Sequence, residues 1–426
     1  MGRRTPGVVL PEEEGGVGEG ANPDSSRRYH AFDCLRAAAM LVGVFFHAAL
    51  SFTDPPQIYW AANDSSRHVL VFLFAWATHG FRMQVFFLMS GFFAHLVYRR
   101  YGVHHFVRHR VKRLVLPFAG GIMLIVPIVQ VVWLYGSVSG ATEVPIPAVQ
   151  AATSELLTVG RYLRTLGPAH LWFLEYLILF SGGALIASAV VGTLTTRCPL
   201  GWIDRVFRRL VRAPWKPLVL AVPTTATMYL MGIWILDGPS GFVPQPRFVV
   251  YYGLFFAFGW LLHRHPDLLA LELRRYHWGY LGAALLLVGV TPVFFLSQPV
   301  PYHSYAGWYP FATLSLSSIY TWLMVFGLMG VFLQAIRRET PLIRYVSDSS
   351  YWVYLIHLPL VACLQIVLAK SPVPGILKYL IIIGIALVLL FLSYEHLVRY
   401  TLIGATLNGR RERPVGRRLL SLWPSR

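Results

Sequence analysis

The chain has few charged residues for its length. Charged side chains make up 13% of its 426 residues, and acidic groups are the scarcer kind, with 19 Asp and Glu against 37 Lys and Arg. Soluble domains carry about twice that share of charge. Hydrophobic residues reach 56%, and the mean hydropathy is +0.55. This composition excludes an ordinary soluble protein and predicts one that lies in a membrane.

Cysteine is also scarce. The three cysteines are Cys34, Cys198 and Cys363, and none has a second ligand at CxxC or CxxH spacing. Neither a disulfide framework nor a zinc site is therefore indicated, and we expect no bound metal or cofactor. Residues 1–27 are polar and glycine-rich and lack the apolar core of a cleavable signal. We expect this segment to be a disordered tail.

What the chain does have is a series of long apolar runs. A membrane-spanning helix needs about 20 apolar residues, and about ten segments qualify. They lie approximately at 35–53, 80–98, 113–135, 169–192, 217–236, 248–263, 278–297, 310–334, 348–369 and 376–400. A shorter apolar stretch at 67–79 is expected to be an interfacial or re-entrant lead into the second span. The fold class is an all-α polytopic membrane protein.

The basic residues indicate the topology. Most of the 37 Lys and Arg fall in alternate connections between these segments and in the two tails. By the positive-inside rule, both termini should be cytoplasmic and the loops 136–168 and 298–309 should be outside. We expect a transmembrane domain at 28–402 and a basic cytoplasmic tail at 403–426. The net charge of +18 thus reflects topology and contact with the lipid bilayer, and nucleic-acid binding is not supported.

The first span carries two polar residues that point the same way. Arg36 and His47 are eleven positions apart, which returns a helix to nearly the same face about 16 Å further along. Ionisable groups inside a membrane are costly, so a functional role is the default interpretation. The alternative is a snorkelling arginine and a histidine bonded to a neighbouring helix.

Three other spans bring costly polar groups to a similar depth, the middle and outer half of the membrane. The second span carries His79 and Arg82, the fourth carries His170 and Glu175, and the ninth carries His357. Their shared depth suggests one polar cavity together with His47.

Each of these residues also has a structural alternative. Glu175 could merely neutralise Arg82, and His170 could be an interfacial histidine. His357 could satisfy backbone carbonyls freed by Pro359. Ser90-Gly91 fits close helix packing better than a nucleophile.

Several motifs, in this order, resemble those of acyltransferase family 3 over about residues 28–402. They are Asp33-x-x-Arg36-x10-His47, Phe86-Phe-x-x-Ser90-Gly91-Phe, the basic stretch Phe106 to Pro117, His170-Leu-Trp-Phe-Leu, and Ser350-Tyr-Trp-Val-Tyr-Leu-Ile-His357-Leu-Pro359. The His79-Gly-Phe-Arg82-Met variant and Glu175 are most similar to the branch that includes the succinyltransferase of osmoregulated periplasmic glucans.

The resemblance implies transfer of an acetyl- or succinyl-type acyl group from cytoplasmic acyl-CoA to a carbohydrate hydroxyl on the outer side of a bacterial inner membrane. It implies that His47 is the catalytic base and that the basic motif with Arg108, Arg110 and Arg113 binds the CoA phosphates. The resemblance and the depths together assign substrate binding to Arg36, His79, Arg82, His170, Glu175 and His357. Direct transfer and an acyl-histidine intermediate both remain open.

A secondary transporter or a flippase of a saccharide or lipid-linked saccharide is the alternative from another functional class. Transporters commonly show related halves with interrupted spans at matching positions. The polar motifs here gather in spans 1, 2, 4 and 9, without matching halves. This distribution favours an enzyme.

Overall fold

The computed structural model describes most of the chain between Pro23 and Asn408. The described ranges are 23–54, 56–57, 60–139, 141, 167–195, 201–233, 238–239, 241–270, 272–296 and 308–408. Most of both expected tails and most of both expected outer loops therefore lie outside the described residues. Within the described ranges the secondary structure is helical, with one isolated bridge between Thr53 and His68.

A helix overlaps each of the ten apolar segments. These are α1 (Pro23–Ala49), α2 (Val69–Arg110), α3 (Leu116–Val138), α6 (Trp172–Thr195), α8 (Lys216–Met231), α9 (Pro246–Arg264), α11 (His277–Leu296), α12 (Trp308–Ala335), α13 (Pro341–Ala369) and α14 (Gly375–Ser393). Shorter helices at the ends of these include η1 (Leu50–Phe52), η2 (Val111–Val115), η3 (Ala169–Leu171), α7 (Gly201–Arg212), α10 (Asp267–Ala270), η4 (Tyr394–Val398) and α15 (Leu402–Asn408).

Six helical stretches within the described residues are long and apolar enough to cross a membrane. They are His30–Phe52, Val69–Val138, Ala169–Val190, Trp308–Ala335, Pro341–Ala369 and Gly375–Val398. The second stretch contains both α2 and α3. The protein is thus a multi-pass helical membrane protein.

The apolar stretch at 67–79, expected to lead into the second span, belongs almost entirely to the same helix as that span. Helix α2 begins at Val69 and continues through the second span, and its backbone is interrupted only at Gly102, where φ is 77°. That uninterrupted part is roughly 50 Å long, well beyond the hydrocarbon thickness of about 30 Å. Its N-terminal turns extend the same helix that carries His79 and Arg82.

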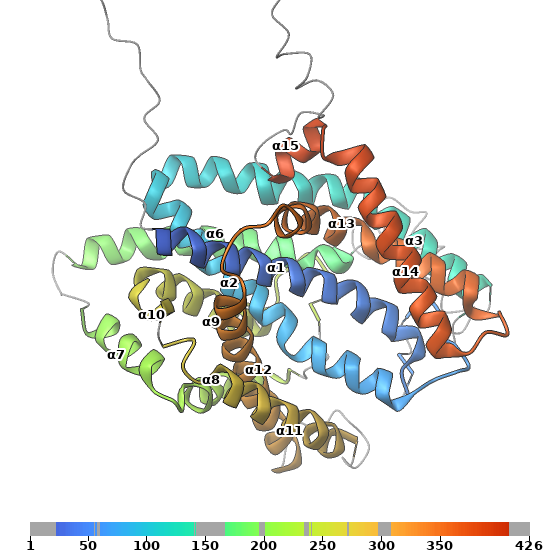
Figure 1. The fold of residues 1–426 in the computed structure, drawn as a ribbon, viewed down its shortest axis with the longest axis horizontal. Coiled ribbons are helices and arrows are strands. Elements are labelled where there is room, and N and C mark those ends of the chain that lie inside the picture. Colours follow the sequence, from blue (N-terminus) through green and yellow to red (C-terminus); the bar gives the residue numbers. More distant parts are fainter. Residues whose placement is uncertain are drawn as a thin grey trace, which may run out of the picture.

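Helix α1 is central to the arrangement. It packs against α2, α12, α13 and α14, and it crosses the middle of the molecule in Figure 1, whereas α7 and α11 lie at the edge.

The longest helix contact, between α2 and α9, depends on two glycines. A Cβ atom on Gly91 would lie 2.0 Å from the carbonyl oxygen of Phe256, and one on Gly259 would lie 1.8 Å from that of Leu88. Small residues allow such backbone contact between membrane helices. The close packing expected at Ser90-Gly91 is confirmed.

Candidate active site

Three histidines from different helices meet near the C-terminal end of α1. The ring of His47 lies 5.1 Å from that of His357 in α13, and His357 lies 5.4 Å from His170 in η3, measured between ring centroids. We call these three residues the histidine cluster. His170 and His357 are buried, while His47 is half-buried. Residues 310 positions apart in the sequence, His47 and His357, thus form one polar site.

Backbone carbonyls fix two of these rings. Nδ1 of His357 donates to the carbonyl oxygens of Val353 and Tyr354, at 3.1 and 2.8 Å. Nε2 of His170 donates to the carbonyl oxygen of Leu355 at 2.9 Å, and the Tyr354 hydroxyl donates to the His170 carbonyl. Because carbonyls only accept, each neutral ring keeps one nitrogen without a proton, Nε2 in His357 and Nδ1 in His170.

The carbonyl that His170 bonds is left free by a proline in α13. Pro359 lies inside α13 and has no N–H to bond the carbonyl four residues earlier. That carbonyl belongs to Leu355, and its partner is His170 rather than His357 as the sequence suggested. His170 is only 9% exposed, so its ring lies inside the protein and not on its surface.

The backbone before His170 is strained. Ala169 has φ 45°, and it is the only residue other than glycine with positive φ among those described. This left-handed conformation costs a residue with a Cβ atom roughly 1–2 kcal/mol. Strain of this kind concentrates at functional sites, and here it lies in the turn that aims His170 at α13.

Arg82 adds a positive charge to the cluster. Its side chain is 6% exposed, and it interacts electrostatically with His47 and His357. The guanidinium lies 4.5 Å from the Phe46 ring centroid. Gly43 leaves room for it, since a Cβ there would lie 3.1 Å from the Arg82 Nη1. Among the described residues no carboxylate forms an ion pair with Arg82, which makes this site suited to an anionic group.

Glu175 does not neutralise Arg82. It lies in the first turn of α6, and one of its carboxylate oxygens is buried without a hydrogen bond to any described residue. The structural alternative, in which Glu175 merely neutralises Arg82, is therefore wrong. His79, one turn before Arg82 in α2, stacks on Phe46 with 5.1 Å between ring centroids, and so joins the edge of the site.

A second, basic cluster forms near the other end of α1. Arg36 bonds Asp33 at 3.1 Å, one turn earlier in the same helix. Arg110 and Arg113, from the end of α2 and from η2, both interact electrostatically with Arg36. In Arg110, Nε and Nη2 are buried and have no hydrogen-bond partner in the described part of the chain.

The structure groups the expected site residues differently from the sequence prediction, which placed Arg36 with the substrate-binding residues. Arg36 is grouped with Arg110 and Arg113, and we call these three the basic cluster. It lies about 16 Å from His47 along α1, by helix geometry. Arg108, by contrast, is exposed. Two aspartates, Asp33 and Asp348, interact with these three arginines. The remaining excess of positive charge favours a polyanionic ligand.

Two further residues contact His47 and were missed from sequence. Trp60 stacks on the His47 ring with 5.5 Å between centroids and 7° between planes, and Gln365 donates to the His47 carbonyl oxygen. An uncharged amide inside an otherwise apolar span was a usable signal for Gln365. Trp60 gave none, because a tryptophan beside a span resembles an ordinary interfacial aromatic residue.

The described part of the chain contains no candidate metal-binding group. No set of three or more His, Cys, Asp or Glu side chains there has the arrangement that holds a metal ion.

The comparison with known proteins agrees with this architecture. A family model described as an acyltransferase domain matches residues 29–395. Glucans biosynthesis protein C of Salmonella typhi and of Salmonella typhimurium are each 25% identical over 411 residues, covering 90% of this chain and 95% of the relative. The protein of the same name from Salmonella dublin is 26% identical with the same coverage. No solved structure gave a significant match. The chain belongs to acyltransferase family 3 and is a membrane acyltransferase.

Proposed function

We propose that this protein is an O-acyltransferase of the bacterial inner membrane. It takes an acetyl- or succinyl-type group from cytoplasmic acyl-CoA and transfers it to a carbohydrate hydroxyl on the outer side. The observation that carries the proposal is the pair of polar clusters on α1, one basic and one of histidines, about three helical turns apart.

The basic cluster suits the donor. A CoA nucleotide carries several phosphate charges, and arginines bind phosphate through paired, charge-assisted hydrogen bonds. Arg110 has the buried, unpartnered donors that such binding requires. With the nucleotide there, the extended pantetheine arm brings the thioester along α1 toward His47.

The histidine cluster suits the transfer step. A sugar hydroxyl is a weak nucleophile, and a neutral histidine is a suitable general base for it. In direct transfer His47 takes the hydroxyl proton while the oxygen attacks the thioester carbonyl. The new C–O bond forms, the C–S bond breaks, and the thiolate takes up a proton to leave as CoA. In the alternative, His47 carries the acyl group between two half-reactions.

Arg82 has two roles compatible with its position. It can stabilise the negative charge that develops on the carbonyl oxygen, or hold the free carboxylate of a succinyl donor. The unprotonated nitrogens of His170 and His357 can accept hydrogen bonds from neighbouring hydroxyls of the acceptor. A glucan is the first acceptor to try, since the relatives are named for glucan biosynthesis.

The activity test uses purified full-length protein in detergent with radiolabelled acetyl-CoA or succinyl-CoA and a short β-glucan. Label transferred to the glucan, with an equal amount of CoA thiol released and no ion gradient, is the expected result. Transport of glucan by reconstituted protein without any acyl transfer would reject the enzyme and support the transporter alternative.

Sidedness is tested by labelling single cysteines in intact cells. In a variant without the three native cysteines, Gly140→Cys should react with a membrane-impermeant reagent from outside, and Gly409→Cys only after permeabilisation. Equal external labelling of both positions would contradict the proposed direction of transfer.

A further inference from the structure

Among the described residues, none supplies His47 with the orienting carboxylate that a catalytic histidine commonly has. Such histidines are usually held by a carboxylate on the second ring nitrogen. Here the His47 side chain forms no hydrogen bond or ion pair with any carboxylate among the described residues, and its Nδ1 is buried without a partner. Phe46 meets the imidazole edge-on and His357 lies at a tilt to it, whereas Trp60 lies flat against it, nearly parallel at 7°.

Gln365 fixes both Trp60 and the backbone of His47. Its Oε1 accepts from the indole Nε1 of Trp60 at 2.9 Å. Its Nε2 donates to the carbonyl oxygens of His47 and Ala48, both at 3.0 Å. These are among the last carbonyls of α1, which have no partner within the helix. One buried amide thus sets the end of α1 and the indole relative to each other.

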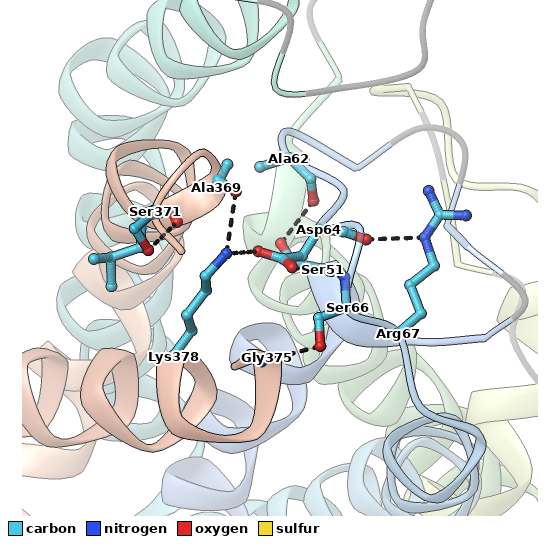
Figure 2. Close-up of polar contacts among 10 residues, drawn as sticks. Ser51, Ala62, Asp64, Ser66, Arg67, Ala369, Ser371, Gly375 and Lys378 are labelled. Atoms are coloured by element: carbon cyan, nitrogen blue, oxygen red, sulfur yellow. Dashed lines mark hydrogen bonds and ion pairs between the residues drawn. The ribbon is translucent and has the colours of Figure 1, made fainter. Parts of the chain in front are cut away.

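The connection that carries Trp60 is itself firmly attached. Between η1 and α2, Asp64 forms an ion pair with Lys378 of α14 at 2.6 Å, and the two side chains are 2% and 3% exposed. Lys378 also donates to the carbonyl oxygen of Ala369, and the Ser66 hydroxyl accepts from the Gly375 amide at 3.1 Å. Figure 2 shows these contacts converging on the turn between α13 and α14.

Indole stacking also fits the charge change in the reaction. When His47 takes a proton its ring becomes a cation, and the face of tryptophan is the best aromatic partner for a cation. The stabilisation is larger in the charged state than in the resting state, which is the condition for an effect on turnover. A carboxylate would do the same, but it would also pair with Arg82 and remove its free charge.

We infer that Trp60 and Gln365 are positioning residues for His47, with the indole replacing the carboxylate that usually orients a catalytic histidine. This inference rests on the proposed role of His47 as the base. It assigns the α1–α2 connection a part in catalysis, because that connection delivers Trp60 to the ring.

The test compares variants of the full-length protein in detergent, with turnover expressed per folded molecule. Trp60→Leu removes the aromatic face, Trp60→Phe keeps a smaller face without the N–H, and Gln365→Met removes all three amide hydrogen bonds. Trp322→Leu is the matched control, since Trp322 is a buried indole stacked on Phe255 and bonded to Thr224 of α8. Each is assayed with acetyl-CoA or succinyl-CoA and the β-glucan.

The expected result is a loss in kcat of about 3- to 30-fold for Trp60→Leu, with KM for acyl-CoA within twofold of the wild type. Trp60→Phe should lose less than Trp60→Leu, and Trp322→Leu should lower folded yield without changing turnover. In a His47→Ala background, Trp60→Leu should cause no further loss. An equal loss in both backgrounds, or unchanged kcat, would overturn the inference.

A chemical readout separates this inference from the proposed function. Trp60→Leu should speed modification of His47 by diethylpyrocarbonate, followed by peptide mass spectrometry, whatever the activity. An unchanged rate at His47 would count against the stacking role. An inactive wild type, or a fully active His47→Ala, would instead reject the proposed function.

Discussion

His170 binds the carbonyl oxygen of Leu355 through its Nε2, at 2.9 Å, and thereby joins the start of α6 to the middle of α13. The bond exists because Pro359 supplies no N–H to that carbonyl. A proline in one helix therefore sets the ring orientation of a histidine in another.

Replacing this proline should disturb the site without weakening the fold. Pro359→Ala adds an N–H that competes with His170 for the Leu355 carbonyl. Losing a hydrogen bond of about 1 kcal/mol corresponds to roughly a fivefold fall in turnover, and the regained helical bond should keep folded yield at or above the wild-type level. Turnover per folded molecule measures the effect.

A second helical proline provides the control. Pro223 lies inside α8 and is exposed, so Pro223→Ala should leave turnover unchanged. Full activity of Pro359→Ala, or the same loss in both variants, would show that the Leu355 carbonyl does not position His170.

The sequence was sufficient for the class of fold and for the histidines that meet near the end of α1, but not for Trp60 and Gln365 or for the pairing of the side chains. Membrane-spanning helices can be recognised in a sequence from the length of their apolar runs. His47 and His357 were identified because ionisable groups are costly in a membrane. The pairing of Arg36 with Arg110 depends on how α1 and α2 pack, which no local pattern encodes. Likewise, the separation of Glu175 from Arg82 depends on how α6 is oriented.

The basic cluster should govern affinity for the donor. Arg110→Gln and Arg113→Gln should each raise KM for acyl-CoA, by about tenfold if a charge-assisted bond to phosphate of about 1.5 kcal/mol is lost. The exposed Arg108 should give the smallest change of the three. Steady-state kinetics at fixed glucan concentration test this, with folded yield measured in parallel. Unchanged donor KM in all three variants and in the triple variant would reject a phosphate site here.

The buried pair of Asp64 and Lys378 should matter mainly for stability. Removing one partner leaves an uncompensated buried charge, so Asp64→Asn or Lys378→Met should cost about 3–5 kcal/mol. The double variant Asp64→Asn/Lys378→Met should recover part of this loss, because no lone charge remains. Thermal unfolding in detergent, followed by tryptophan fluorescence, compares the three. Single variants as stable as the wild type would show that the connection is not held by this pair.

The most direct test of the account is the turnover of His47→Ala per folded molecule, measured beside His357→Ala and His170→Ala. A general base contributes about 10²–10⁴-fold, so His47→Ala should lose at least a hundredfold while still inserting in the membrane and binding acyl-CoA. The other two variants should lose less, because they hold the acceptor or the packing. A His47→Ala protein with lower folded yield but turnover within about tenfold of the wild type, well short of a base's usual contribution, would contradict the assignment of His47 as the base.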